Sequence, residues 1–207
     1  MLETIRTTIT NFCMDFVRNP YECYTEHGQH ALFYSMLFSA LSEQQRFITW
    51  KNQKVCALQK EYPTAGKLGK PKRQHWDIAI LKSPPESCIE GGSSYDYLKL
   101  FAVVEFGMNG SAEHLNDDIA RLCHKDANLE HGFIVHLYRL SKSGALFSGR
   151  DWGSSSPRIL TLEDVQSLSV GKPVEIFYGV SDSTGNHHAG VWSVKDGVVI
   201  ELDVSEY

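Results

Sequence analysis

The chain has 207 residues, of which 42% are hydrophobic, 22% charged and 11% aromatic. This composition is ordinary for one globular domain with a single sizeable core, so intrinsic disorder is not expected. The formal net charge of -5 argues mildly against non-specific binding of polyanions, although charge can be segregated locally. No apolar run approaches the ~20 residues of a membrane span, and the first ten residues lack the order of a secretory signal. We therefore expect a cytoplasmic protein with no membrane partner.

The cysteines are odd in number, scattered, and mostly placed in apolar segments. A disulfide framework is therefore not expected, and buried, reduced thiols agree with a cytoplasmic protein. The five cysteines are Cys13, Cys23, Cys56, Cys88 and Cys123.

Two helices are predicted in the N-terminal part of the chain. Apolar residues at helical spacing predict the first over residues 2–18. Asn19 as N-cap, Pro20 at the first helical position and Glu22 at the third predict that a second helix begins there. A stripe of apolar residues continues this second helix to about Ser42.

Strands and loops alternate in the middle of the chain, after a polar stretch. The third predicted strand is nearly all apolar, which is typical of a strand covered on both faces. The segment 82–96, rich in proline, glycine and serine, is a predicted surface excursion. The predicted elements are strands at 55–63, 75–81 and 98–106, a helix at 112–125 and a strand at 132–140.

The remainder of the chain is rich in predicted β-structure. A glycine- and serine-rich loop precedes a short helix near 162–168, and strands follow at 174–180 and 189–202, with 195–197 as a hairpin turn. This order of elements indicates a mixed α/β domain. We assign residues 1–140 to the α/β core and residues 141–207 to a β-rich C-terminal extension packed on the same domain.

Three acidic residues stand where apolar residues are expected. Asp77 opens the second strand, and Glu105 lies within the third. Glu26 falls within roughly 20° of Phe33 and Leu37 around the second helix, so it continues the buried stripe. An ionised carboxylate removed from water is normally paired, hydrogen-bonded or bound to a metal. If two strands and one helix bring these acids together, they suit a hard divalent cation that activates water for phosphodiester hydrolysis.

Each acid also has a simpler interpretation. In this interpretation, Glu26 lies beyond the edge of the core, Asp77 caps a strand, and Glu105 pairs with an arginine such as Arg121. If all three acids are merely paired in this way, the protein is structural and does not depend on a metal.

The acids occur in a sequence context that resembles a known family. The helix with Glu26 in TEHGQHALFYSML is followed by EYPT, by HWDIAIL with its isolated Asp77, and by AVVEFG with Glu105 entering the helix EHLNDDIARL. Over about residues 20–140 this resembles the PD-(D/E)XK nuclease superfamily. The resemblance implies a restriction-endonuclease-like core, a central mixed sheet flanked by helices. It also implies that Asp77 and Glu105 bind Mg²⁺ or Mn²⁺, that Glu26 assists, and that the three acids are catalytic.

The chain departs from the family at one position. The family places a lysine two residues after the strand glutamate, where it helps to activate water, and this chain has Gly107 there. Lys60 on the neighbouring strand is the sterically easiest replacement, and Lys72 or Arg73 in the basic loop are further candidates.

The predicted function is therefore a Mg²⁺-dependent endonuclease, with DNA as the expected substrate. The basic loop is expected to contact phosphates through Lys67, Lys70, Lys72 and Arg73. The alternative is a catalytically inactive relative that serves as a nucleic-acid or protein interaction module. A homodimer and another protein partner are both compatible with the sequence.

The 9 histidines also invite a zinc hypothesis. The pair Cys123-His124, taken with His114 or His131, lacks the paired short spacings of structural zinc sites, and His187-His188 lies in a polar loop. A structural zinc site is therefore not expected.

Overall fold

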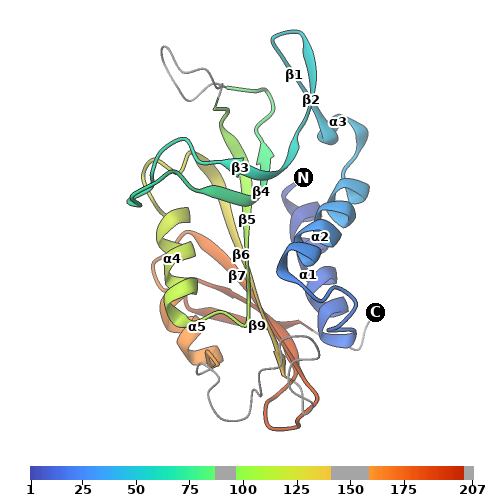
Figure 1. Cartoon of the computed structure of the whole chain (residues 1–207), viewed down its shortest axis with the longest axis vertical. Coiled ribbons are helices and arrows are strands. Elements are labelled where there is room, and N and C mark those ends of the chain that lie inside the picture. The colour runs from blue at the N-terminus through green and yellow to red at the C-terminus, as the bar shows by residue number, and fades with distance from the viewer. Residues whose placement is uncertain (87–96, 141–158, 203–207) are drawn as a thin grey trace.

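The computed structural model describes residues 1–86, 97–140 and 159–202, and a seven-stranded sheet runs through its centre (Figure 1). The strand order is β3-β4-β5-β6-β7-β8-β9. The three central strands β5, β6 and β7 are parallel, and the other neighbours in the sheet are antiparallel. The strands of the sheet are β3 (Leu58–Pro63), β4 (His75–Leu81), β5 (Leu100–Met108), β6 (Leu129–Leu140), β7 (Val174–Asp182), β8 (Gly190–Lys195) and β9 (Val198–Leu202). The prediction of an α/β fold with a central mixed sheet is confirmed.

Helices cover both faces of this sheet. In Figure 1, α1 and α2 lie on one side and α4 and α5 on the other. The helices are α1 (Leu2–Arg18), α2 (Glu26–Ala40), the short α3 (Glu43–Arg46), α4 (Ala112–Leu122) and α5 (Leu162–Ser169). The sheet therefore separates two hydrophobic cores, and a strand residue contributes to one or the other according to the face it occupies.

The core beneath α1 and α2 is aromatic at its centre. Phe12 of α1, Phe33 of α2 and Phe106 of β5 pack edge to face, with ring centroids 5.3 to 5.8 Å apart. Complete burial of each such side chain contributes about 1.5–3 kcal/mol. Because these rings join both helices to β5, they fix α2 over the end of that strand.

The opposite core lies beneath α4 and α5. Leu115 and Ile119 of α4 pack there with Val103 of β5 and Ile134 of β6. β5 is thus buried on both faces, as its apolar sequence predicts, and it extends to Met108, beyond the predicted end at residue 106.

The strands predicted after residue 140 continue the same sheet. β7 pairs in parallel with β6, and β8 and β9 follow antiparallel. The predicted hairpin turn is confirmed, because Lys195 pairs with Val198 and both intervening residues have positive φ, 47° at Asp196 and 74° at Gly197. The predicted serine-rich loop lies outside the described residues, as does most of the surface excursion at 82–96.

The predicted start of the second helix is wrong. α2 begins at Glu26, with Thr25 as N-cap, whose side-chain oxygen accepts a hydrogen bond from the backbone N–H of Gly28 (3.0 Å). Asn19 instead caps the C-terminus of α1, where its backbone N–H donates to the carbonyl of Asp15. α2 also ends at Ala40, slightly before the predicted end. Asparagine suits both ends of a helix, and here the C-terminal role prevails.

The predicted strand at 55–63 is divided between two strands, because residues 55–56 end β2 and β3 begins only at Leu58. β2 (Gln53–Cys56) forms a separate hairpin with β1 (Phe47–Trp50), which projects at the top of Figure 1. Lys51 and Asn52 form the turn of this hairpin, with φ values of 46° and 62°. Each of these strands has only four residues, which is too short for a periodic apolar pattern to reveal it. The helix predicted at 112–125 also ends early, at Leu122.

The described cysteines, Cys13, Cys23, Cys56 and Cys123, are free thiols, but only Cys13 is buried, and the other three are half-buried. In the part of the chain that the structure describes, no helix is long and apolar enough to cross a membrane.

Candidate metal centre

Two of the predicted acids accept hydrogen bonds from the backbone at one edge of β5. The regular pairing of β4 with β5 ends at Ile78 and Val104. Beyond that point, the backbone N–H of Phe106 donates to Oδ2 of Asp77 (2.8 Å), and the N–H of Met108 donates to Oε2 of Glu26 (3.1 Å). Alternate residues of a strand direct their N–H groups to the same side, so both carboxylates line one edge, about 7 Å apart along the strand.

Asp77 reaches this position because the alternation of side chains between the two faces of the sheet is interrupted near the start of β4. Ile78 lies in the core beneath α1 and α2, whereas Trp76 lies in the opposite core, although strict alternation would place both on one face. Asp77 consequently approaches α2, where its Oδ2 lies 3.8 Å from Nε2 of His30.

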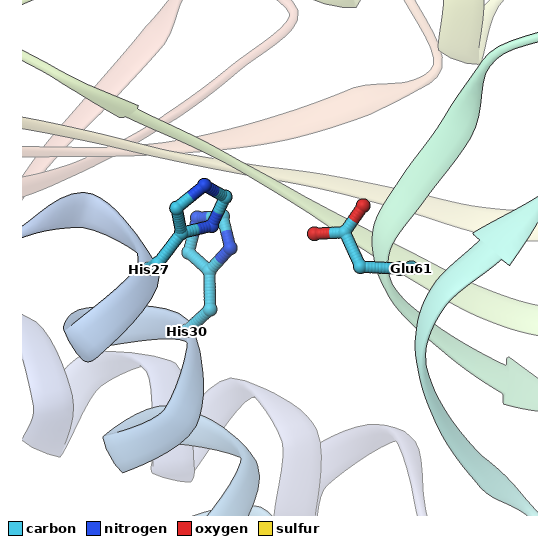
Figure 2. Close-up of side chains that lie close together, drawn as sticks. All are labelled: His27, His30 and Glu61. Carbon is cyan, nitrogen blue, oxygen red and sulfur yellow. The ribbon is translucent and has the colours of Figure 1, made fainter.

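β3 shows a matching irregularity beside Asp77. Glu61 has a left-handed φ of 53°, which is uncommon for a residue other than glycine. Its neighbour Lys60 pairs with Ile78, and Tyr62 pairs with Trp76. The side chain of Glu61 thereby comes to face α2 (Figure 2).

The third predicted acid, Glu105, has a different partner. Its side chain is buried and forms an ion pair with Arg121 of α4. The Arg121 guanidinium also lies 5.3 Å from the centre of the Trp76 ring and 3.9 Å from a carboxylate oxygen of Asp118. The alternative interpretation of Glu105, pairing with Arg121, is therefore what the structure shows.

Burial dominates the ionisation of this pair. It raises the pKa of Glu105 well above the usual value, with Asp77 and Asp118 adding to the rise and Arg121 opposing it. Arg121 supplies the positive charge that makes a buried carboxylate tolerable at this position.

Position 107, where the sequence resemblance predicts a lysine, faces a histidine of the next strand. Gly107 is the parallel ladder partner of His136 on β6. A Cβ atom at position 107 would lie 2.8 Å from Nδ1 and 3.2 Å from Cε1 of that ring. Glycine is thus required by the close approach of the imidazole, and a lysine does not fit here unless the ring moves.

The His136 ring is held in place by a hydrogen-bond chain. Its Nε2 lies 3.1 Å from the hydroxyl of Tyr138, which donates to the carbonyl of Gly110 (2.6 Å). Since the hydroxyl proton is used in that bond, we assign the Nε2 proton to His136, which leaves Nδ1 as an acceptor. Burial is the main cause that lowers the pKa of His136 to about 4, so the ring is neutral at pH 7.

The predicted phosphate contacts are only partly available. Lys70 is ion-paired with Asp117 of α4, and Arg73 stacks on the Tyr97 ring at 4.5 Å and hydrogen-bonds its hydroxyl. Lys67 and Lys72 are exposed.

Lys60 is also exposed, at the β3 edge of the site. It lies close enough to His30 for its charge to oppose protonation of that ring. Of the three candidates to replace the lysine that the resemblance predicts, Lys60, Lys72 and Arg73, Lys60 is the one on the strand beside Asp77, where it pairs with Ile78.

A set of metal-ligating side chains that sequence reasoning missed lies beside Asp77. One ligand atom from each of His27, His30 and Glu61 lies within 4.8 Å of the others. Figure 2 shows both imidazoles on the first turns of α2, with the Glu61 carboxylate facing them from β3. The available signal was the His-x-x-His spacing directly after Glu26, which places both rings on one helix face.

Comparisons with models of protein families, with curated proteins and with solved structures found no match. Functional inference for this chain therefore depends on the geometry of the site.

Proposed function

We propose that this chain is a metal-dependent nuclease with a restriction-endonuclease-like fold, which hydrolyses phosphodiester bonds in DNA. The observation that supports this most is the placement of Asp77 from β4 and Glu26 from α2 along one edge of β5, the strand that carries Glu105. Carboxylates from a helix and two adjacent strands are the arrangement that the sequence resemblance implies.

The proposed roles follow from these positions. Asp77 and Glu26 supply oxygen ligands, and Glu105 remains beside them with its charge balanced by Arg121. A divalent ion bound there would lower the pKa of a bound water and stabilise negative charge on the phosphoryl group. In the overall reaction, the water oxygen bonds to phosphorus, the bond to one sugar oxygen breaks, and a proton passes to that leaving oxygen. Lys60 takes the role of the motif lysine.

The best-supported alternative is an inactive relative that binds nucleic acid or protein without cutting. Two observations favour it, the His136 ring over Gly107 and the ion pair that occupies Glu105. Both remove a group on which the family mechanism depends.

Cleavage of supercoiled plasmid with Mg²⁺ or Mn²⁺ separates the two. The nuclease proposal expects nicking that Asp77→Asn abolishes and that Lys60→Ala slows by roughly 10²-fold, the usual contribution of a positioned proton-transfer group. Lys195→Ala is the matched control, because Lys195 is an exposed lysine on β8. If neither wild type nor Asp77→Asn cleaves double- or single-stranded DNA, the nuclease proposal is wrong. Retained DNA binding at low salt would then favour the interaction module.

A further inference from the structure

The side chains around His30 provide a set of donors that the carboxylate proposal does not use. His30 is only 1% exposed, and neither of its ring nitrogens has a hydrogen-bond partner among the described residues. Buried polar groups are nearly always hydrogen-bonded, so such a group calls for a specific explanation. The His30 imidazole has a free lone pair and lies in a cluster with a second histidine and a carboxylate. A role as a metal ligand explains this arrangement.

The other members of the cluster are accessible. His27 and Glu61 are exposed, so an ion can enter without any rearrangement of the core. Two ligands of a tetrahedral ion with bonds of about 2.0–2.1 Å lie about 3.4 Å apart. The ligand atoms of the cluster, within 4.8 Å of one another, therefore need to move by on the order of 1 Å. Rotation of the exposed side chains supplies this, while buried His30 stays fixed.

The surroundings suit a cation. The carboxylate of Asp77 adds negative charge beside the cluster, with its Oδ2 3.8 Å from Nε2 of His30. A carboxylate in this position beside a metal-bound histidine fixes the ring and increases its basicity. At 3.8 Å Asp77 lies beyond hydrogen-bond distance of His30, so it would have to approach by on the order of 1 Å to take this role.

We propose that His27, His30 and Glu61 bind one first-row transition-metal ion, of which Zn²⁺ is the best match. Imidazole nitrogen suits Zn²⁺ and its neighbours, whereas Mg²⁺ requires oxygen ligands in near-octahedral geometry. Two histidines and one glutamate leave a fourth position open for water or a substrate oxygen, which is the ligand set of hydrolytic zinc sites. A catalytic role for this ion rests on the proposed nuclease function, but its binding does not.

The proposal is tested by calorimetric titration of metal-free protein with Zn²⁺, and by the visible spectrum of bound Co²⁺ as a report of nitrogen ligation. We expect one Zn²⁺ per chain and much weaker binding of Mg²⁺. His27→Ala and Glu61→Gln should each weaken Zn²⁺ binding by at least about tenfold, the lower limit even for outer-shell partners. Both residues are exposed, so these variants keep the fold, which circular dichroism verifies.

His188→Ala is the matched control. His188 is an exposed histidine that lies 3.2 Å from a carboxylate oxygen of Glu201, and it is remote from α2 in the sequence. Its replacement should leave Zn²⁺ affinity unchanged. If wild type shows no such binding, or if His27→Ala and Glu61→Gln bind Zn²⁺ as tightly as wild type, the site does not exist.

The same variants separate this proposal from the nuclease proposal. Zn²⁺ binding that depends on His27 and Glu61, without any DNA cleavage, supports the metal site and removes the nuclease function. Plasmid cleavage with Mg²⁺ that both variants retain in full, together with unchanged Zn²⁺ binding, supports the nuclease and overturns the transition-metal site.

Discussion

Replacement of Gly107 by alanine tests whether the His136 ring requires glycine at this position. In an ordinary strand, Gly→Ala stabilises the protein by roughly 0.5–1 kcal/mol, because glycine loses more conformational freedom on folding. At position 107, however, the new Cβ would lie 2.8 Å from Nδ1 of His136. Tyr138 holds that ring by a 3.1 Å contact to its Nε2, so the ring does not turn aside without loss of a buried interaction. We expect Gly107→Ala to destabilise the fold by about 1–3 kcal/mol, the usual range for overpacking.

Urea denaturation of the single and double variants measures this effect. A loss of about 1–3 kcal/mol corresponds to a fall of roughly 2–12 °C in Tm for a domain of this size. In Gly107→Ala/His136→Ala, the ring is absent and the extra methyl should no longer cost stability, so the two changes should couple by about 1–3 kcal/mol. Gly66→Ala is the control, because no atom lies within 4 Å of a Cβ built there. A Gly107→Ala protein as stable as wild type would refute the steric reasoning.

Other consequences concern charge, pH, helix capping and metal removal. Arg121→Ala should cost about 3–5 kcal/mol in urea denaturation because Glu105 is left buried and unpaired, whereas Glu105→Leu/Arg121→Met should be close to neutral. His136, with a pKa near 4 in the folded protein and 6.5 unfolded, stabilises the fold fully above about pH 6.5. Between about pH 8 and pH 4, the wild type should therefore lose about 3 kcal/mol of stability relative to His136→Leu. Thr25→Ala should cost about 1 kcal/mol through loss of the α2 N-cap, and an equal loss in stability for Thr25→Ser would contradict that role. Chelation with EDTA should lower the unfolding midpoint of the Zn²⁺-loaded protein by the lost binding free energy but leave the chain folded, unlike a domain that folds around its metal.

Much of the sheet is predictable from the sequence because its strands have strong local patterns. β4 occupies the predicted residues 75–81, and β5 is a continuous apolar run because parallel strands are covered on both faces. The prediction fails where the local signal is short or ambiguous. Asn19 fits a helix start as well as a helix end, and the strands of the β1–β2 hairpin, four residues each, are too short for a pattern to be recognised.

The candidate site was predictable only where one residue violates a pattern. Asp77, Glu105 and Glu26 are acids among apolar residues, so each was identified singly. His30 is one of two histidines near the start of a largely apolar helix, and Glu61 violates no pattern because a glutamate near the end of a strand is usually solvated. Their proximity depends on the left-handed backbone of Glu61 and on the packing of α2 against β3, which are tertiary features.

The structure also explains how this chain tolerates its acids. Every motif carboxylate has a partner within the protein, since Asp77 and Glu26 accept backbone N–H groups of β5 and Glu105 pairs with Arg121. None of the three therefore requires a metal for the fold to be stable. Among the described residues, His30 is a buried imidazole with no hydrogen-bond partner on either ring nitrogen, at the side of the cluster that faces α2 and β3. The group that calls for a ligand is therefore the His30 imidazole of α2, and not Glu105 of β5, where the sequence resemblance places a metal ligand.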